Sequence, residues 1–167
     1  MSVLQIRRFP DPLLKQPTRL VERVDDRVRQ FIDALIRTMR HHPRCVGLAA
    51  PQVGSDLRIA VMDSSVHPKT TASRGLIVLV NPQIEVAEGE VLQREGCLSI
   101  PDLTANVRRA DRIQLRSFDQ FGSVQQLVLE GFEAVIAQHE IDHLDGTLFL
   151  DRVANLATDV FRRKTYL

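Results

Sequence analysis

Apolar residues recur with the period of a helix between Asp25 and Arg40. Asp25 or Asp26 can accept hydrogen bonds from the free N–H groups of the first turn. His42 precedes Pro43, and the residue before a proline avoids helical geometry. The pattern therefore predicts an amphipathic helix over residues 25–40, whose buried stripe consists of Val28, Phe31, Ile32, Leu35, Ile36 and Met39.

The middle of the chain is typical of strands. Its apolar runs are short, rich in β-branched residues, and separated by Gly, Pro or Asn-Pro. Residues 119–122, Asp-Gln-Phe-Gly, have the composition of a turn that joins the last two runs as a hairpin. The predicted strands are Leu57–Met62, Leu76–Val80, Ile84–Leu92, Ile113–Phe118 and Val124–Leu129.

Two further helices are predicted toward the carboxyl end. One covers Phe132–Leu144 and stops at Gly146, and a short basic one covers Ala157–Lys164. No repeat, low-complexity tract or Gly/Ser linker divides the chain, so we expect one domain over residues 1–167. Helices at both ends with strands between them predict an α+β fold, with antiparallel or mixed sheets packed around the helix at 132–144.

Composition and charge exclude several classes of protein. The chain has 167 residues, and its 44% of hydrophobic residues suffice for a core. Its net charge of +1 argues against a concentrated positive surface for nucleic acid, so no DNA partner is expected. No run approaches the roughly 18 apolar residues of a membrane span, and the first residues lack a secretory signal pattern. Two cysteines, Cys45 and Cys97, cannot form a disulfide framework, so we expect a reducing, cytoplasmic compartment without membrane attachment.

The candidate chemistry begins with His139-Glu140-Ile141-Asp142-His143 on the predicted helix at 132–144. Residues four apart lie about 40° apart around a helix, so both imidazoles can hold one metal ion. Glu140 lies beside them, close enough to take a proton from a metal-activated water. The alternative is an amphipathic helix that carries two histidines by chance, and it is weakened because the chain has only five histidines.

A catalytic metal site of this kind needs a third protein ligand. Phe149 stands where one protease superfamily places a third histidine, and no glutamate follows Glu140 to serve the arrangement of another. Cys97 has the better context among the upstream residues, because it follows a predicted strand and Gly96 permits close approach there. A buried, purely structural role is the alternative for either cysteine. The candidates for the third ligand are therefore Cys97, Cys45, His41, His42 and His67.

Three separate blocks of the sequence resemble the peptide deformylase family. The first is Gly47-Leu48-Ala49-Ala50-Pro51-Gln52, and the second is Glu95-Gly96-Cys97-Leu98-Ser99. The third covers residues 138–146, Gln-His-Glu-Ile-Asp-His-Leu-Asp-Gly. Their order and separation are similar to the family's, as is the segment at residues 9–13, so the resemblance covers essentially the whole chain.

The resemblance implies a metal-dependent hydrolase that removes the N-formyl group from the initiator methionine of newly made polypeptides and releases formate. Glu140 would be the general base and acid. Gln52 and the backbone N–H of Leu98 would stabilise the oxyanion, a role that suits a neutral N–H donor. One divalent metal ion, natively iron(II) with zinc, nickel or cobalt as alternatives, would be held by Cys97, His139 and His143.

The methionine side chain of such a substrate needs an apolar slot near the metal. Val135 and Ile136 precede His139 by one helical turn and share its face, although ordinary core packing is the alternative. The resemblance also places four residues around that slot or along the substrate backbone, namely Val46, Gly47, Glu95 and Gly96.

Two positions depart from the family's pattern. Cys45 stands where the first block usually begins with a glycine, so its side chain would narrow the groove or offer a second thiol near the metal. Thr104 stands where a larger basic or aromatic residue would be expected over the distal part of the substrate, so few extended peptide contacts are expected.

The basic carboxyl end has two interpretations. The resemblance suggests that a terminal basic helix docks near the ribosomal exit, with Arg162, Arg163 and Lys164 as contacts. The alternative is that these residues only complement the dipole of their helix.

Two other functions compete with the deformylase. A zinc peptidase with an unusual ligand set is disfavoured by the missing third His or Glu. A non-catalytic metal or thiol sensor, whose groove is closed by Cys45, is disfavoured because the complete set of ligands, Glu140 and Gln52 is present.

Overall fold

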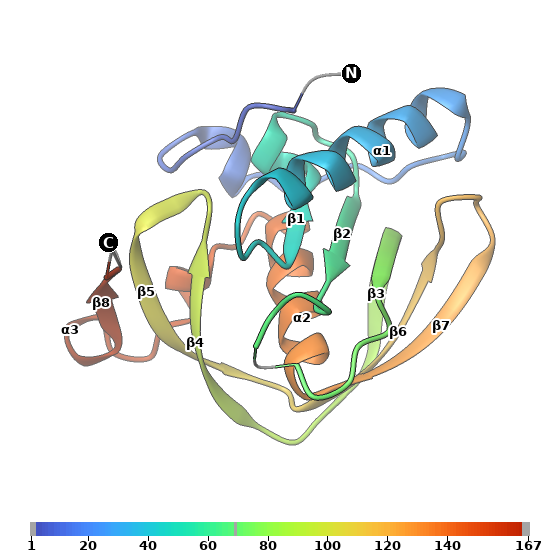
Figure 1. Ribbon diagram of the computed structural model, residues 1–167. Coiled ribbons are helices and arrows are strands. Elements are labelled where there is room, and N and C mark those ends of the chain that lie inside the picture. The colour runs from blue at the N-terminus through green and yellow to red at the C-terminus, as the bar shows by residue number, and fades with distance from the viewer. Residues whose placement is uncertain (1–2, 69, 165–167) are drawn as a thin grey trace.

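The computed structural model describes residues 3–68 and 70–164 and confirms the α+β class. A five-stranded sheet has the order β1-β2-β3-β6-β7, and a three-stranded sheet has the order β4-β5-β8. All strand pairs within the sheets are antiparallel, and α2 lies between the sheets (Figure 1). The elements are η1 (Pro12–Lys15), α1 (Asp26–His41), β1 (Gly47–Ala49), η2 (Ala50–Val53), β2 (Ile59–Asp63), β3 (Leu76–Glu88), β4 (Val91–Cys97), β5 (Ile100–Arg109), β6 (Arg112–Phe118), β7 (Val124–Glu130), α2 (Gly131–Leu144), η3 (Phe149–Arg152), α3 (Leu156–Asp159) and β8 (Val160–Arg162).

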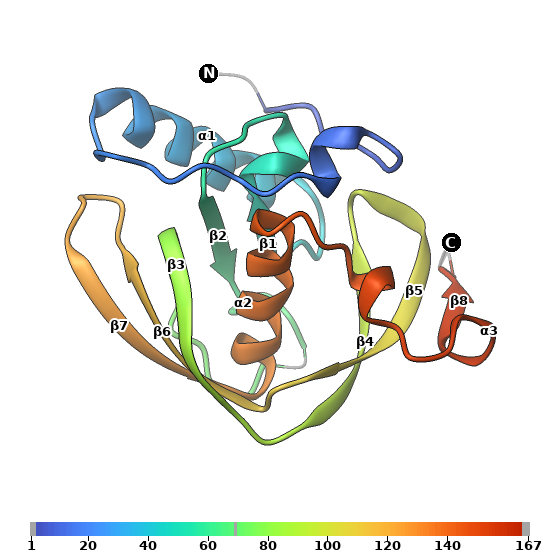
Figure 2. The ribbon, with the colours of Figure 1, turned by 180° about the vertical axis from the view of Figure 1, so that it is seen from behind.

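One long two-stranded ribbon joins the two sheets. β3 pairs with β6 as far as Glu88 and Arg112, and β4 continues the pairing with β5 from Val91 and Arg109. The ribbon passes beneath α2 from one sheet to the other, as both views show (Figures 1 and 2). The last pair of the ribbon joins Cys97 at the end of β4 to the start of β5. The fold thereby brings Cys97 to α2 from a distant part of the chain.

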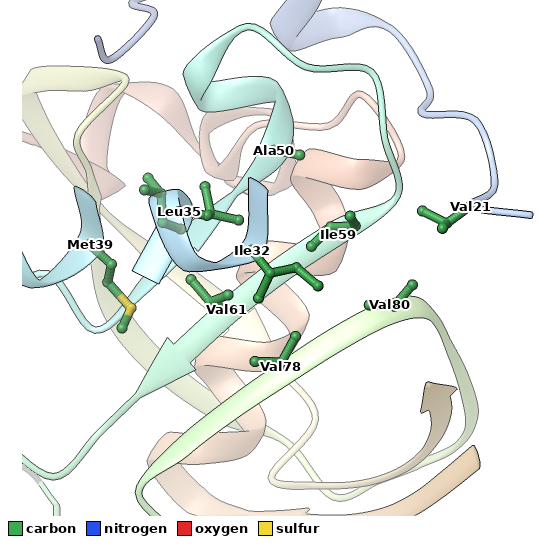
Figure 3. Close-up of a cluster of buried hydrophobic side chains, with 10 residues drawn as sticks. Val21, Ile32, Leu35, Met39, Ala50, Ile59, Val61, Val78 and Val80 are labelled. Atoms are coloured by element: carbon green, nitrogen blue, oxygen red, sulfur yellow. The ribbon is translucent and has the colours of Figure 1, made fainter. Parts of the chain in front are cut away.

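The helix predicted over residues 25–40 is confirmed as α1. The Asp25 side chain caps it by accepting a 2.9 Å hydrogen bond from the N–H of Val28, and the helix ends just before Pro43. Its apolar stripe packs on one face of the five-stranded sheet, where Leu35 and Met39 approach Val61 (Figure 3). This contact forms the first of the protein's hydrophobic clusters.

The inner strands β2 and β3 each contain a continuous apolar run, residues 59–62 and 76–80, where both faces of the sheet are covered. In β2, Val61 packs toward α1 and its neighbour Met62 belongs to the cluster beneath α2. In β3, Val78 and Leu79 divide between the two clusters in the same way. Strands covered on both faces read as continuous hydrophobic runs, which explains the apolar runs in the sequence. The central helix α2 is likewise mostly buried, and its buried residues include the polar side chains of Glu133, Glu140, Asp142 and His143.

Two predicted chain reversals are confirmed. At the β6–β7 hairpin, Asp119 Oδ1 accepts a 2.8 Å hydrogen bond from the N–H of Phe121, and Gly122 adopts a left-handed φ of 84°. After α2, Gly146 has a φ of 73°, and a Cβ there would lie 2.9 Å from backbone atoms of Lys15 and Gln16. A glycine is therefore required at the end of α2 for both conformation and space.

The strand boundaries around Asn81 and Gly89 were predicted wrongly. Asn81-Pro82 does not separate two strands, because β3 runs through it with a shift in register. Asn81 takes a left-handed φ of 52° while its side chain bonds to both backbone groups of Val21. The chain turns instead at Gly89, inside the predicted strand Ile84–Leu92, because its φ of 71° suits a turn.

The predicted basic helix over residues 157–164 is wrong. Helix α3 covers only Leu156–Asp159, and the chain then forms β8, in which Val160 pairs with Ala105 of β5. The open edge of β5 offers hydrogen bonds to a β-branched and an aromatic residue, so tertiary pairing prevails over helical propensity. The three-residue strand β1 and the ten-residue strand β5 were also not predicted. In the described part of the chain, no helix is long and apolar enough to cross a membrane.

Candidate metal centre

Three potential metal ligands meet between α2 and the tip of the ribbon. His139 and His143 lie one turn apart on α2, and Cys97 ends β4. One donor atom from each residue lies within 4.8 Å of the others, and Cys97 Sγ is 3.2 Å from His143 Nε2. Cys97 is thus the upstream residue that the fold brings to the histidine pair.

The other candidates for the third ligand do not join this cluster. Within the described residues, the only group of metal-binding side chains contains Cys97 and neither Cys45 nor a third histidine. The rings of His41 and His42 lie edge to face at the end of α1, and the ring of His67 lies 4.7 Å from that of Phe132. These four residues were therefore wrong as candidate ligands.

The chemistry of the donor set fits a divalent transition metal. Burial by itself would raise the pKa of the Cys97 thiol, but His143 and His139 hold that pKa well below its usual range. This environment favours the thiolate, which is the form that binds metals. A thiolate with two imidazoles accepts zinc, iron(II), cobalt or nickel.

A buried carboxylate holds the first ligand histidine in place. Glu95 Oε2 lies 2.7 Å from Nδ1 of His139, and Arg109 donates to both Glu95 oxygens at 2.7 and 2.9 Å. Burial opposes ionisation of Glu95, but the hydrogen bonds from Arg109 and His139 lower its pKa to about 2. An ionised partner at Nδ1 fixes the ring and leaves Nε2 of His139 for the metal.

A second carboxylate completes the network behind the ligands. Asp142 on α2 accepts hydrogen bonds from Arg109 at 2.5 Å and from Arg152 at 2.9 and 2.7 Å. Arg109, Asp142 and Glu95 are all nearly inaccessible to solvent, so each buried charge needs its partner. The sequence analysis missed the roles of Arg109, Arg152 and Asp142. Neither arginine lies in a motif, and the one available signal for Asp142 was its position between the two ligand histidines.

Glu140 lies in the same buried space with one oxygen unbonded. Its side chain is 4% exposed, and Oε2 has no hydrogen-bond partner among the described residues. Burial raises the pKa of Glu140 to about 7. A Cβ at Gly47 would lie 2.8 Å from Cδ of Glu140, so only glycine at position 47 leaves room for this carboxylate. The arrangement therefore places a carboxylate that can both accept and release a proton near neutral pH beside the three ligands.

The amide of Gln52 is directed at the metal ligands. Its Oε1 accepts a 2.9 Å hydrogen bond from the N–H of Ala49, which fixes which end of the amide faces inward. Its Nε2 lies 3.2 Å from both Cys97 Sγ and Ser99 Oγ. Gln52 is 2% exposed, so this N–H₂ group is a preorganised donor beside the centre.

A cavity of about 540 Å³ opens onto the cluster. Cys45 lines it and donates a hydrogen bond to the carbonyl of Gly47, and burial raises the pKa of its thiol to about 12. Arg163, which the sequence analysis did not place here, reaches the cavity from β8. The predicted oxyanion and substrate residues all line this cavity, namely Gln52, Leu98, Val46, Gly47, Glu95, Gly96, Val135 and Ile136.

The amino-acid sequence is similar to those of known proteins over almost its whole length. A family model described as polypeptide deformylase matches residues 3–159. The peptide deformylase of Thermodesulfovibrio yellowstonii is 38% identical over 98% of this chain and 97% of its own length. That of Syntrophobacter fumaroxidans is 40% identical over 98% of this chain and 94% of its own length.

Solved structures share the fold as well. The peptide deformylase of Thermotoga maritima matches with a TM-score of 0.85 and 35% identity, over 93% of this chain and all of that one. A class I type b peptide deformylase of Acinetobacter baumannii, crystallised with Met-Ala-Ser, gives 0.85 and 33% identity over 91% and 99% of the two chains. This chain therefore belongs to the peptide deformylase family and is a metal-dependent amidohydrolase that removes the formyl group from N-terminal formylmethionine.

Proposed function

We propose that residues 1–167 act as one catalytic domain in which Cys97, His139 and His143 hold a single metal ion and Glu140 moves the proton. The observation that carries this proposal is the unbonded, buried oxygen of Glu140 beside the three ligands. A divalent metal ion bound by these residues supplies an activated water and polarises the formyl carbonyl.

Glu140 acts as general base and then as general acid. Because burial brings its pKa to about 7, the carboxylate can accept the proton of the attacking water and later release it. The water oxygen bonds to the formyl carbon and gives a tetrahedral oxyanion, and the carbon–nitrogen bond breaks when this oxyanion collapses. The proton then passes from Glu140 to the leaving amine, so that formate and a free methionine amine are the products.

Gln52 and Leu98 provide the oxyanion donors. The Gln52 amide is fixed by Ala49 and directs its N–H₂ group toward Cys97. The family resemblance assigns the second donor to the backbone N–H of Leu98, which follows Cys97 at the tip of the ribbon. Neutral donors held in advance stabilise the developing negative charge without competing for the proton.

The cavity holds the first residues of the substrate. Val135 and Ile136 on α2 are both 4% exposed and form an apolar wall for the methionine side chain. Val46 and Gly47 border the slot, and the backbone of Glu95 and Gly96 runs along the peptide. The relative from Acinetobacter baumannii with bound Met-Ala-Ser supports a groove for a peptide that begins with methionine.

Iron(II) is the native metal in this proposal. Zinc is satisfied by four ligands, whereas iron(II) more readily adds a fifth and so accommodates substrate and water together. The zinc, nickel and cobalt forms are alternatives that the same donor set accepts.

The enzyme works in the cytoplasm on N-formylmethionyl peptides. Both Cys45 and Cys97 are free thiols, which suits a reducing compartment. Docking near the ribosomal exit would involve Arg162, Arg163 and Lys164. They lie beyond the end of α3, so they do not complement its last turn. Salt-sensitive co-sedimentation with ribosomes, lost on truncation after Phe161, is the expected result, and no co-sedimentation at low salt would contradict docking.

The proposed activity is tested by formate release from formyl-Met-Ala-Ser, with acetyl-Met-Ala-Ser as the matched amide. The deformylase releases formate and leaves the acetylated peptide intact. A peptidase would cut internal bonds in both peptides, and a sensor would cleave neither. Cleavage inside the peptides, or no formate from metal-replete protein, would contradict the proposal.

A further inference from the structure

Four basic side chains line the cavity together with only two carboxylates. Glu95 and Glu140 are buried, and Glu95 is engaged by Arg109 and His139. In the described residues, none of the basic groups forms an ion pair. The cavity wall therefore carries uncompensated positive charge from Arg44, Arg94, Arg163 and Lys164.

Arg163 reaches the cavity because β8 pairs with the outer edge of β5. In the sheet, Thr104 of β5 pairs with Phe161 of β8 on one side and with Gly96 of β4 on the other. The backbone N–H of Arg163 donates a 2.8 Å hydrogen bond to the carbonyl of Asp102, which extends this pairing by one residue. The guanidinium is thereby carried across the sheet toward Gly96.

Small residues leave the space that Arg163 occupies. A Cβ at Gly96 would collide with the guanidinium, whose Cζ lies 3.2 Å from that position, and Thr104 Cγ2 lies 3.4 Å from it. The expectation from Thr104 alone was a groove with few distal contacts. Arg163 supplies a basic group over the same surface from a different element.

Arg94 extends the positive surface and helps to hold β8. Its guanidinium lies 3.6 Å from the ring centroid of Phe161 and donates a 2.9 Å hydrogen bond to Asn106. A cation over an aromatic ring fixes the position of both groups. Arg94 lies on β4 and Arg163 directly follows β8, so both arginines border the cavity from the same three-stranded sheet.

We propose that Arg163 is a specificity-determining residue that binds a carboxylate of the substrate downstream of the formylated methionine. The inference rests on the proposed function, because it takes the cavity as the peptide groove. The planar fork of a guanidinium matches a carboxylate, and no acidic group of the described chain occupies it. Gly96 directly precedes the ligand Cys97, and an extended peptide advances about 3.3 Å per residue, so the carboxylate belongs to the second or third residue.

The size of the effect follows from the exposure of Arg163. Exposed charge pairs contribute modestly, so we expect a preference of about 2- to 5-fold for the acidic peptide in kcat/KM. The preference should appear mainly in KM and should shrink at high salt, because ions screen exposed charges.

The test compares isosteric amidated substrates, which removes the terminal carboxylate as a confounding group. Formyl-Met-Ala-Asp-amide is compared with formyl-Met-Ala-Asn-amide, and formyl-Met-Asp-Ala-amide with its Asn equivalent. A comparison of free-acid with amidated formyl-Met-Ala-Ser shows whether the terminal carboxylate of a peptide binds Arg163 as well as an aspartate side chain does. The wild-type enzyme should prefer the aspartate peptide in at least one pair, and Arg163→Gln should bring that ratio close to one.

Two further variants keep the result interpretable. Arg163→Glu should prefer formyl-Met-Ala-Lys-amide over formyl-Met-Ala-Asp-amide, the reverse of the wild-type preference. Loss of folding could not produce such a reversal. Arg116→Gln is the matched control, because Arg116 is an exposed arginine of β6 outside the cavity, and it should keep the wild-type ratio. Binding of the products Met-Ala-Asp-amide and Met-Ala-Asn-amide, measured by calorimetry, should show the same preference without turnover.

The outcomes separate this inference from the proposed function. Equal rates on every aspartate and asparagine pair, or an unchanged preference in Arg163→Gln, would overturn the role of Arg163 while deformylation stands. Failure of the wild-type enzyme to release formate from any of these peptides would instead overturn the proposed function.

Discussion

Glu95 lies 2.7 Å from the Nδ1 atom of His139, on the same strand that provides Cys97 two residues later. One ribbon therefore supplies both a metal ligand and the group that orients another ligand. Arg109 holds Glu95 from the neighbouring strand β5. The position of His139 is thus fixed by a buried hydrogen bond to Glu95, which Arg109 holds in turn, as expected of a preorganised site.

Glu95→Gln should weaken metal binding by about 10- to 100-fold, because an amide holds His139 less firmly and leaves Arg109 short of a buried partner. Competition with a chelator, followed by elemental analysis, measures the change. Glu90→Gln is the control, since Glu90 is exposed on the same ribbon and pairs with Arg108 at the surface. Wild-type metal affinity in Glu95→Gln would show that Glu95 does not orient the ligand.

Gly47→Ala should lower kcat by about 10²-fold or more while leaving the three ligands in place. The added Cβ would lie 2.8 Å from Cδ of Glu140 and 2.9 Å from its Cγ, so the carboxylate must move. Activity measured at equal metal content tests this, with a thermal melt to establish that the variant is folded. Near-normal turnover in Gly47→Ala would mean that the position of Glu140 is not critical.

The two cysteines should respond differently to alkylation. With metal bound, Cys97 is protected as a ligand, and after chelation it should react rapidly because its pKa is held low. Cys45 should react slowly in both states, because burial raises the pKa of its thiol to about 12. Mass mapping of the labelled peptides distinguishes them.

The same ligand assignment predicts the behaviour of two variants. Cys97→Ser should weaken or change metal binding, whereas Cys45→Ser should leave the stoichiometry at one ion per chain. Protection of Cys45 instead of Cys97 by metal would show that the ligand set is wrong.

The sequence predicted the residues of the site more accurately than it predicted the boundaries of the strands. His139, Glu140 and His143 fall within one helix, so their spacing alone indicated a shared metal. The local context of Cys97 favoured it among five candidates, and the family resemblance then singled it out, because its approach to α2 depends on the pairing of β4 with β5. The roles of Glu95 toward His139 and of Arg109 depend on the same pairing, and no local pattern encodes it.

The errors in the fold have a common physical cause. Asn81 adopts a left-handed backbone inside β3 because its side chain bonds to Val21, which is 60 residues away in sequence. Val160 and Phe161 form a strand because the edge of β5 is available to them. In both places a partner distant in sequence decides the local conformation, which propensity alone cannot indicate.

Protein loaded anaerobically with iron(II) should be the more active form and should lose activity in air. Oxygen or peroxide can oxidise both the metal and the Cys97 thiolate, whereas the zinc form should be slower and stable in air. Rates are compared at metal contents matched by elemental analysis. Equal or faster deformylation by the zinc form, or an iron form indifferent to peroxide, would contradict the assignment of iron(II).

The most direct test of the account is the turnover of metal-replete Glu140→Ala, measured as formate released from formyl-Met-Ala-Ser. The variant keeps Cys97, His139 and His143, so its metal content should match the wild type, and Glu90→Ala serves as an exposed glutamate control. Loss of the buried proton carrier should lower kcat by about 10²- to 10⁴-fold or more. Normal metal content with this loss is the predicted result, and near-normal turnover in metal-replete Glu140→Ala would contradict the mechanism.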